Sequence, residues 1–293
     1  MNLNSMCIPC MLTKQQQLIN HFTDEDKKSE YIHQVLKVLY DYAQTESSPW
    51  IGDQLHKLFR EFWGESKDYT EIKHKFNKLV LSKEDEVERR IRQSSDPLKE
   101  CINYVCAGNY IDFGVTSNVS EEMFEELWQK AGDEEVSEEE YAHFCEDLAN
   151  AKTLVYLTDN CGEIVFDKIF IRHIKEAYPD LQITTIVRGE DVVNDATMTD
   201  AAEVGLTELV TCMGNGNAAA GTLLKLMADA SKQVLLNADV IISKGMGNFE
   251  SLYGENLNPY YLFLCKCELF TKRFGLDLYA SVFMKEERIQ IAW

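Results

Sequence analysis

Polar side chains that could do chemistry follow four short apolar segments of the sequence. They are Asp159, Asn160 and Glu163 in TDNCGE, Arg188 and Asp195 in RGEDVVNDAT, the asparagines of GNGN, and Lys244, Gly245 and Asn248 in SKGMGN. The apolar segments are rich in β-branched residues and are predicted strands, and each polar group precedes a helical pattern. Because ligands of an open parallel sheet bind beyond the carboxyl ends of its strands, the four groups are predicted to form one site.

Hard oxygen ligands come from two of these strand ends. Asp159 and Asn160 follow the first strand and Asp195 follows the second, which brings together the carboxylate and amide oxygens that magnesium or manganese prefers. Cys161 lies among oxygen donors, and all six histidines lie in predicted helices away from this edge, which argues against zinc. The three residues therefore predict a site for a divalent metal ion, which could be manganese, magnesium, cobalt or nickel.

The other strand-end residues suit an anion. Arg188 and Lys244 could hold phosphate oxygens, and glycine-rich turns near Gly162 and Gly245 expose backbone N–H groups at helix starts. Lys244 and these amides would stabilise charge that grows on transferring oxygens, and with a metal ion they are the equipment for phosphoryl transfer to water. The attacking group stays open, because Asp159 could form an aspartyl-phosphate or a water molecule could attack directly.

The chain of 293 residues has a formal net charge of -20, which limits its partners. Phosphate backbones and anionic membrane surfaces would be repelled, so neither nucleic acid nor a membrane is expected. No window approaches the roughly 20 apolar residues of a membrane span, and the first residues lack a signal-peptide pattern. We expect a cytoplasmic protein with a small phosphorylated substrate, whose charge a bound divalent cation would offset. Nothing in the sequence indicates an oligomeric state.

The elements that must position these residues fall into two parts. Residues 1–150 are predicted to form a helical domain, in which Tyr31, Val35 and Leu39 make one apolar stripe. Residues 151–293 alternate strands with helices, which indicates a parallel sheet covered on both faces. The predicted fold is a three-layer α/β/α domain with a mostly parallel sheet, plus an all-helical N-terminal domain.

The α/β part is predicted to contain six strands, at 153–158, 183–188, 208–213, 239–244, 278–283 and 289–293. Helices are expected between the first four strands, at 163–178, 195–205 and 218–235. The last two strands are predicted to form a hairpin through KEER.

Three motifs, taken in order, resemble a known family. TDNCGEIVFD, the aspartate of NDAT 36 residues after Asp159, and SKGMGNFES look like the metal-dependent damage-control phosphatases, long catalogued as domain of unknown function 89. The resemblance covers nearly the whole chain, and CIPC with CAGNYIDFG at 106–114 resembles the subgroup that has an N-terminal CxxC. One departure is GEDVV before NDAT, where relatives often carry a proline, and it bears on the loop that follows Arg188.

The resemblance implies an activity and particular site residues. The activity is hydrolysis of small phosphorylated metabolites, such as sugar phosphates or related damaged metabolites. The implied metal ligands are Asp159, Asn160 and Asp195, the implied substrate contacts are Lys244 and Asn248, and Glu163 would lie in the same pocket. Asn109 and Asp112 of GNYID would reach this pocket from the helical domain.

Other functions fit the same residues less well. A protein carboxyl methyltransferase that uses S-adenosylmethionine, an activity proposed for some relatives, needs a glycine-rich first turn and an acid ending the second strand, and TDNCGE and IVRG supply neither. GNGNAAAG follows the third strand rather than the first, which argues against a dinucleotide cofactor. Haloacid-dehalogenase phosphatases carry DxD, whereas position 161 here is Cys. A non-catalytic metal-binding protein is the remaining alternative.

Structural interpretations exist for several of these residues. Asp159 could be a turn or N-cap aspartate, and Asn194 could be a capping partner near Asp195. CIPC at 7–10 is half of a zinc site that CKC at 265–267 could complete, and all of these cysteines could equally be buried thiols.

Overall fold

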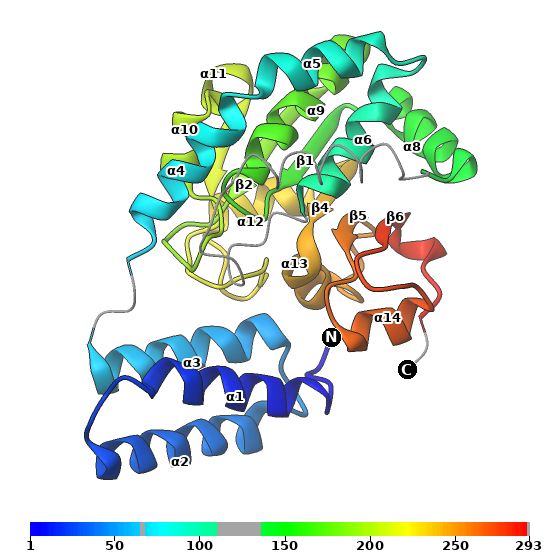
Figure 1. Cartoon of the computed structure of the whole chain (residues 1–293). Coiled ribbons are helices and arrows are strands. Elements are labelled where there is room, and N and C mark those ends of the chain that lie inside the picture. Colours follow the sequence, from blue (N-terminus) through cyan, green and yellow to red (C-terminus); the bar gives the residue numbers. More distant parts are fainter. Residues whose placement is uncertain (65–67, 110–135, 292–293) are drawn as a thin grey trace.

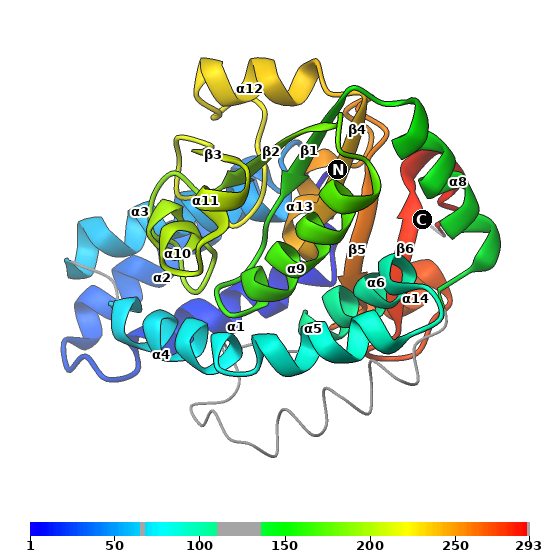
Figure 2. The same ribbon diagram turned by 90° about the horizontal axis from the view of Figure 1, so that it is seen from above.

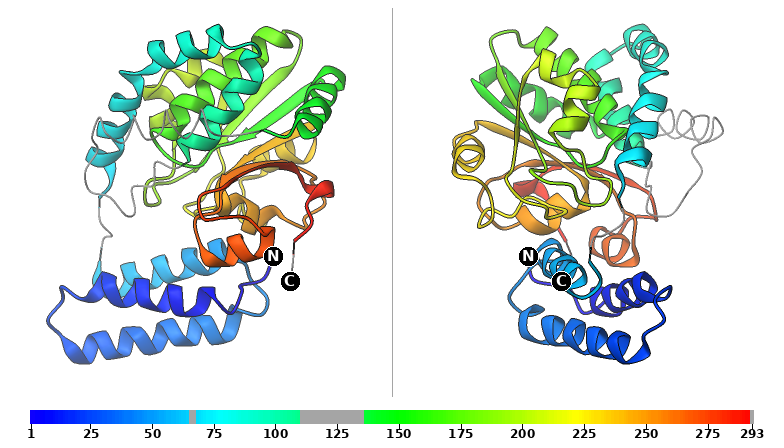
Figure 3. Two further views of the ribbon diagram at one scale, coloured as in Figure 1. Left: turned by 45° about the vertical axis from the view of Figure 1, so that its right-hand side comes forward. Right: turned by 90° about the vertical axis from the view of Figure 1, so that its left-hand side faces the viewer.

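The structure is a computed structural model that describes residues 1–64, 68–109 and 136–291 (Figure 1). A bundle of α1 (Cys7–Ile19), α2 (Glu25–Tyr42) and α3 (Ser48–Trp63) lies beside a larger body built on a sheet. Figure 3 shows α2 on the side of the bundle that faces away from this body. Within the described ranges, no helix combines the length and the apolar composition that a membrane crossing requires.

The sheet has six strands in the order β3-β2-β1-β4-β5-β6. They are β1 (Thr153–Leu157), β2 (Gln182–Val187), β3 (Thr211–Gly214), β4 (Val240–Lys244), β5 (Tyr260–Leu264) and β6 (Ser281–Lys285). Neighbouring strands are parallel throughout, except that β6 runs antiparallel to β5. The predicted α/β fold with a mostly parallel sheet is confirmed.

Alternate side chains of each strand face two different helical layers. Leu154 and Tyr156 of β1 pack in one core. The described helices that share this core are α4 (Thr70–Leu81), α5 (Glu84–Gln93), α6 (Pro97–Gly108), α8 (Glu138–Asn150), α9 (Glu163–Ala177), α10 (Met198–Glu203) and α11 (Leu206–Leu209). Val155 and Leu157 face the other layer, formed by α12 (Asp229–Leu236), α13 (Gly245–Leu252) and α14 (Glu268–Phe274). Figure 2 shows α12 and α5 on opposite sides of the sheet.

The helices before residue 150 contribute to two separate buried cores. Helices α1–α3 enclose a core of their own, which includes the predicted stripe of Tyr31, Val35 and Leu39. Helices α4–α6 and α8 bury their apolar side chains in one core with α9 and the sheet. The domain division at residue 150 stays a prediction, and the helices on the N-terminal side of it include several that pack directly on the α/β core.

The prediction of a C-terminal hairpin was wrong. β6 pairs with β5, and residues 286–288 of KEER form a 3₁₀ helix. The strand YYLFL was missed because all five of its residues are buried, so it has no alternation of polar and apolar positions. The helix expected at 218–235 is also shorter, since only α12 is helical in this region.

Strand order reverses between β1 and β4, which lie side by side although β2 follows β1 in the chain. Because β1 and β4 are parallel, the residues that follow Leu157 and those at Lys244 lie at the same edge of the sheet. Open α/β sheets bind ligands at such a reversal point. The fold therefore brings the polar ends of β1, β2 and β4 to one place.

Candidate active site

The loops after β1 and β2 meet at this edge and bring Asp159, Asn160 and Asp195 together. Asn160 and Asp195 form an isolated β-bridge, and the Ala196 N–H donates to the Asp159 carbonyl oxygen at 2.8 Å. The side chains also touch, since Asn160 Nδ2 donates to Asp159 Oδ2 at 2.8 Å. The three residues proposed from the sequence as metal ligands are therefore neighbours.

The loop that carries Asp195 has a strained backbone. Val193 has a φ of 46°, in a region that β-branched residues rarely adopt. Asn194 beside it is buried, and its Nδ2 donates to Asn160 Oδ1 at 2.9 Å. Asn194 thus links the two loops rather than capping a helix, and Thr197 is the N-cap of α10.

Lys244, at the end of β4, is enclosed by two carboxylates of α9. Its Nζ contacts Glu163 Oε1 and lies 2.9 Å from Asp167 Oδ1, and none of these three side chains is exposed. Glu163 and Asp167 are one helical turn apart, so both point to the same side of α9. Tyr156 donates from its hydroxyl to the same Asp167 oxygen at 2.6 Å. The sequence interpretation missed Asp167, and the signal it left is an acid four residues after Glu163 within the apolar run IVFDKIF.

Arg188 follows β2 and reaches across the edge of the sheet. Its Nε donates to Asp195 Oδ2 at 2.6 Å, and its Nη1 donates to Asn248 Oδ1 at 3.0 Å. Asn248 is itself held by a bond from its Nδ2 to the Thr158 carbonyl at 3.1 Å. The buried Nη2 of Arg188 has no hydrogen-bond partner among the described residues and lies 3.8 Å from Asp159 Oδ1. One donor of this guanidinium is therefore directed at the carboxylates without being used.

Asn109, the C-cap of α6, brings the helical layer into the site. Its Nδ2 donates to Asp159 Oδ2 at 3.2 Å and to Glu163 Oε2 at 3.0 Å. Its Oδ1 accepts the Leu264 N–H at 3.2 Å, which anchors the amide to the end of β5. Asp112, expected from the sequence to lie beside it, falls outside the described residues.

Two glycines were expected to offer backbone N–H groups to an anion, and their surroundings differ. Gly245 has a φ of 80°, and a Cβ added to it would overlap the Asp159 carboxylate. The absence of a side chain at Gly245 therefore makes room for Asp159. The Gly162 N–H donates to Asn77 Oδ1 at 2.7 Å, so the expectation that this amide receives an anion was wrong.

The charges of the site do not balance. Four carboxylates and three cations act on one another here, which leaves a formal excess of one negative charge when all are ionised; the groups are Asp159, Glu163, Asp167 and Asp195 with Lys244, Arg188 and Lys266. Burial, together with the charges of Asp195 and Glu163, raises the pKa of Asp159 to about 7. Burial also raises the pKa of Asp195, although the charge of Arg188 opposes this. A divalent cation would remove the excess.

The donor atoms of the ligand set suit a hard cation. Within the described ranges, no three His, Cys, Asp or Glu side chains come together as a metal cage; the set contains two carboxylates, with Asn160 as its third member. Asn160 Nδ2 donates to Asp159 and to Glu163 Oε2, the latter at 3.1 Å. A half-turn of this amide would direct its oxygen to the same place, and Asn194 would then turn as well and accept from Asn160 Nδ2. An oxygen-only set beside excess negative charge fits magnesium or manganese.

Two further residues border the site. Thr222, in the loop after β3, donates from its hydroxyl to Asn248 Oδ1 at 2.9 Å. Lys266 follows β5; burial alone would raise the pKa of Glu163, but the charges of Lys244 and Lys266 lower it. Ligands bind beyond the carboxyl ends of parallel strands, and Lys266 follows such an end. It would have been predicted as a site residue if β5 had been recognised as a strand.

The cysteine motifs at 7–10 and 265–267 do not form a metal cage in the described part of the chain. All four of their cysteines are free thiols. Burial raises the pKa of Cys7 to about 11 and that of Cys265 to about 12. Both of these thiols are therefore protonated near neutral pH, which makes them poor nucleophiles and favours a packing role for Cys7 and Cys265.

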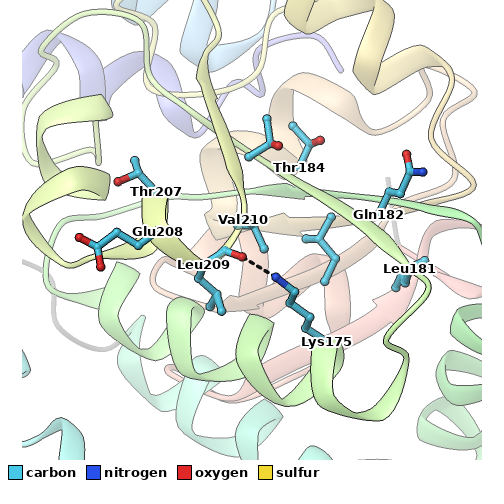
Figure 4. A pocket seen from close by; sticks show the side chains of 10 residues that line it. Lys175, Leu181, Gln182, Thr184, Thr207, Glu208, Leu209 and Val210 are labelled. Carbon is cyan, nitrogen blue, oxygen red and sulfur yellow. Dashed lines mark hydrogen bonds between the residues drawn. The ribbon is translucent and has the colours of Figure 1, made fainter.

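A cavity of about 550 Å³ lies elsewhere, at the amino ends of β2 and β3 (Figure 4). Its walls include Lys175, Gln182, Thr184 and Glu208, and Lys175 Nζ donates to the Leu209 carbonyl at 2.8 Å. None of the site residues proposed from the sequence lines it. This cavity is therefore separate from the residues gathered at the carboxyl edge of the sheet.

Comparison of the whole chain with known proteins identifies its family. A damage-control phosphatase of Archaeoglobus fulgidus is 29% identical over 283 residues, which cover 95% of this chain and 97% of the relative. A damage-control phosphatase of Pyrococcus horikoshii is 27% identical over 290 residues, which cover 98% of this chain and 99% of the relative. The crystal structure of a DUF89 family protein from P. horikoshii has a TM-score of 0.84 at 26% identity and covers 98% of this chain and 99% of that chain. Residues 3–282 match the family model described as "Damage-control phosphatase ARMT1-like domain", and the chain belongs to that family.

Proposed function

We propose that this protein is a divalent-metal-dependent phosphatase that hydrolyses small phosphorylated metabolites, such as sugar phosphates or related damaged metabolites. The names of two relatives support a phosphatase. The observation that carries the proposal is the buried Nη2 of Arg188, directed at Asp159 with no hydrogen-bond partner among the described residues. Leaving a buried donor unsatisfied costs about 1–3 kcal/mol, so its presence favours a ligand with acceptor oxygens, which a phosphoryl group supplies.

Asp159, Asn160 and Asp195 would hold the metal ion. A divalent cation bound there would polarise the phosphoryl group and offset the excess negative charge of the site. The chain orients these ligands through neighbouring side chains: Arg188 Nε donates to Asp195, and the Asn194 amide pairs with the Asn160 amide. Such outer hydrogen bonds fix the direction in which a ligand oxygen points.

The remaining residues would bind and orient the substrate. Arg188 Nη2 would donate to a phosphoryl oxygen while Nε and Nη1 keep the guanidinium in place. Lys244 touches Glu163 and Asp167, so it would hold the Glu163 carboxylate in place beside Asp159. Asp159 would attack phosphorus and form an aspartyl-phosphate that water then hydrolyses, or it would orient a water molecule that attacks directly. In either route the phosphorus–oxygen bond to the metabolite breaks, and one water supplies the hydroxyl group of the released phosphate and the proton of the leaving alcohol.

The test is phosphate release from p-nitrophenyl phosphate and a sugar-phosphate panel, measured on metal-stripped protein. Manganese, magnesium, cobalt and nickel are added back separately, and Asp195→Asn is compared with Glu190→Gln. Glu190 lies in the same loop and is exposed, so its variant is a matched control for the loss of one charge. We expect activity that requires metal and is lost only in Asp195→Asn. No phosphate release with any ion would end the phosphatase proposal.

Two further measurements separate the alternatives. A phosphoenzyme that is stable in acid, sensitive to hydroxylamine and absent from Asp159→Asn would identify Asp159 as the nucleophile. A rise in melting temperature with S-adenosylmethionine but not with manganese would favour the methyltransferase alternative.

A further inference from the structure

Two polar residues of α4 are buried where this helix meets the loops of the site. Lys73 is 4% exposed and Asn77 is 0% exposed, although α4 packs in the core through Phe76 and Val80. Because they are four residues apart, Lys73 and Asn77 lie on the same side of the helix. Buried polar groups are retained where they make specific hydrogen bonds, so the partners of these two residues define what they do.

Asn77 joins the β1–α9 turn to α10. Its Oδ1 accepts the Gly162 N–H at 2.7 Å, and its Nδ2 donates to Asp200 Oδ1 at 2.9 Å and to Glu203 Oε2 at 2.7 Å. These partners are 85, 123 and 126 residues away in the chain. The oxygen of the Asn77 amide therefore binds the turn that follows β1, and its nitrogen binds helix α10, which follows β2.

Lys73 strengthens the connection to the second segment. Its Nζ lies 2.8 Å from Asp200 and 2.9 Å from Asp191, which stand on either side of Asp195 in the sequence. Asp200 Oδ2 also accepts both the N–H and the hydroxyl of Thr197 at 2.8 Å. The loop between Asp191 and Asp200 is thereby fixed at both ends.

This loop needs such support because its backbone is strained. Val193 in the left-handed region costs on the order of 1–2 kcal/mol, and only surrounding contacts keep it there. Without Lys73 the loop would keep the Ala196 N–H bond to Asp159 and the Arg188 bond to Asp195 but lose the ion pairs at both of its ends, and Asp195 would shift relative to Asp159. A metal ion that requires strict ligand geometry would bind less tightly if the spacing of those two carboxylates changed.

We propose that Asn77 and Lys73 are positioning residues that set the distance between the two ligand-bearing loops and so determine the affinity for the metal. This inference rests on the proposed function, since it takes Asp159, Asn160 and Asp195 as the ligands. Neither Asn77 nor Lys73 touches any of these three residues. They act through Gly162, which follows Asn160 by two positions, and through Asp191 and Asp200, which flank Asp195.

The experiment measures Mn²⁺ affinity of metal-stripped protein by calorimetry or by electron paramagnetic resonance, for the wild type, Asn77→Leu and Lys73→Met. Lys75→Met is the matched control, because Lys75 lies on the same helix in an exposed ion pair with Glu71. We expect the Mn²⁺ dissociation constant to rise about 10–100-fold in Asn77→Leu and Lys73→Met and to stay unchanged in Lys75→Met. Saturating Mn²⁺ should restore most of kcat, which a general loss of structure would not allow.

The outcomes distinguish this inference from the proposed function. Wild type that binds Mn²⁺ and variants that bind it equally well would overturn the positioning role and leave the metal site standing. Wild type that binds no Mn²⁺ would remove the metal site and this inference with it. If Asn77→Leu does not fold, Lys73→Met decides the question, because it keeps the hydrogen bonds of Asn77. Hydrogen exchange of the 189–200 amides, faster in the variants than in Lys75→Met, is the second readout.

Discussion

The ammonium group of Lys244 lies 2.9 Å from Asp167, and neither side chain is exposed to solvent. Burial alone would lower the pKa of Lys244, but the charges of Asp167 and Glu163 raise it. Removing the charge of Asp167 leaves Glu163 as the neighbouring carboxylate of Lys244, so the pKa of Lys244 falls. In Asp167→Asn we expect the alkaline limb of the kcat/KM profile to move to lower pH.

Tyr156→Phe is the control for this shift, because it removes a hydrogen bond to Asp167 and keeps both carboxylates. Its alkaline limb should coincide with that of the wild type. Identical limbs in Asp167→Asn and the wild type would mean that Asp167 does not govern the charge of Lys244.

Asp159→Asn should make the metal-free protein more stable at pH 8. Burial raises the pKa of Asp159 from 3.8 to about 7, so the folded state favours the protonated form. The contribution of Asp159 to stability is therefore fully present below pH 3.8 and is lost as the pH rises through 7. The asparagine variant does not titrate, and its advantage should grow over this window to on the order of 3 kcal/mol.

Urea denaturation in EDTA at pH 5 and pH 8 measures this difference. Glu190→Gln, which removes an exposed charge, should track the wild type at both values. An advantage of Asp159→Asn that is the same at pH 5 and pH 8 would rule out titration of Asp159 as its cause.

Gly245→Ala should reduce kcat/KM about 100-fold, because the added methyl group displaces the Asp159 carboxylate by a distance on the order of 1 Å. Gly254→Ala is a close match, since Gly254 also has a positive φ, of 88°, but has no atom within 4 Å of an added Cβ. Both variants carry the same backbone penalty, so a difference in activity isolates the clash with Asp159. Equal activities would refute it.

Arg188→Lys keeps the charge and should still lower kcat/KM, by about 100-fold. A lysine ammonium cannot contact Asp195 and Asn248 and also present a third donor to a phosphoryl oxygen, as the planar guanidinium can. Arg172→Lys, in a half-exposed ion pair with Glu84, should stay within twofold of the wild type. Full activity of Arg188→Lys in steady-state assays would show that the Nη2 donor is not used.

The pattern of apolar and polar residues along the chain predicted the fold class, because strands and helices follow from local periodicity, and the metal-ligand set stays a prediction. A parallel sheet aligns the ends of its strands, so recognising the strands before Asp159, Arg188 and Lys244 was enough to place these residues at one edge. The same reasoning failed at β5, whose uniform burial erased its alternation, and Lys266 was missed with it.

Residues that act across long separations could not be predicted in this way. Asn77 meets Gly162 and Asp200 only because α4 crosses two loops, and nothing in the helical pattern of 70–81 distinguishes it. Asp167 is equally hidden, since an acid on a helix is normally solvated and the buried Lys244 that pairs with it lies 77 residues away.

The shared core of α4–α6 and the sheet has a consequence for how the protein is made. The bundle of α1–α3 encloses its own core and can collapse as soon as Trp63 has left the ribosome. Helices α4–α6 emerge next, but the strands that cover their apolar faces end only with β6 at Lys285. At about 5–20 residues per second, these faces wait roughly 10–35 s for their partners. During this interval the apolar faces of α4–α6 lack the strands that bury them in the folded protein.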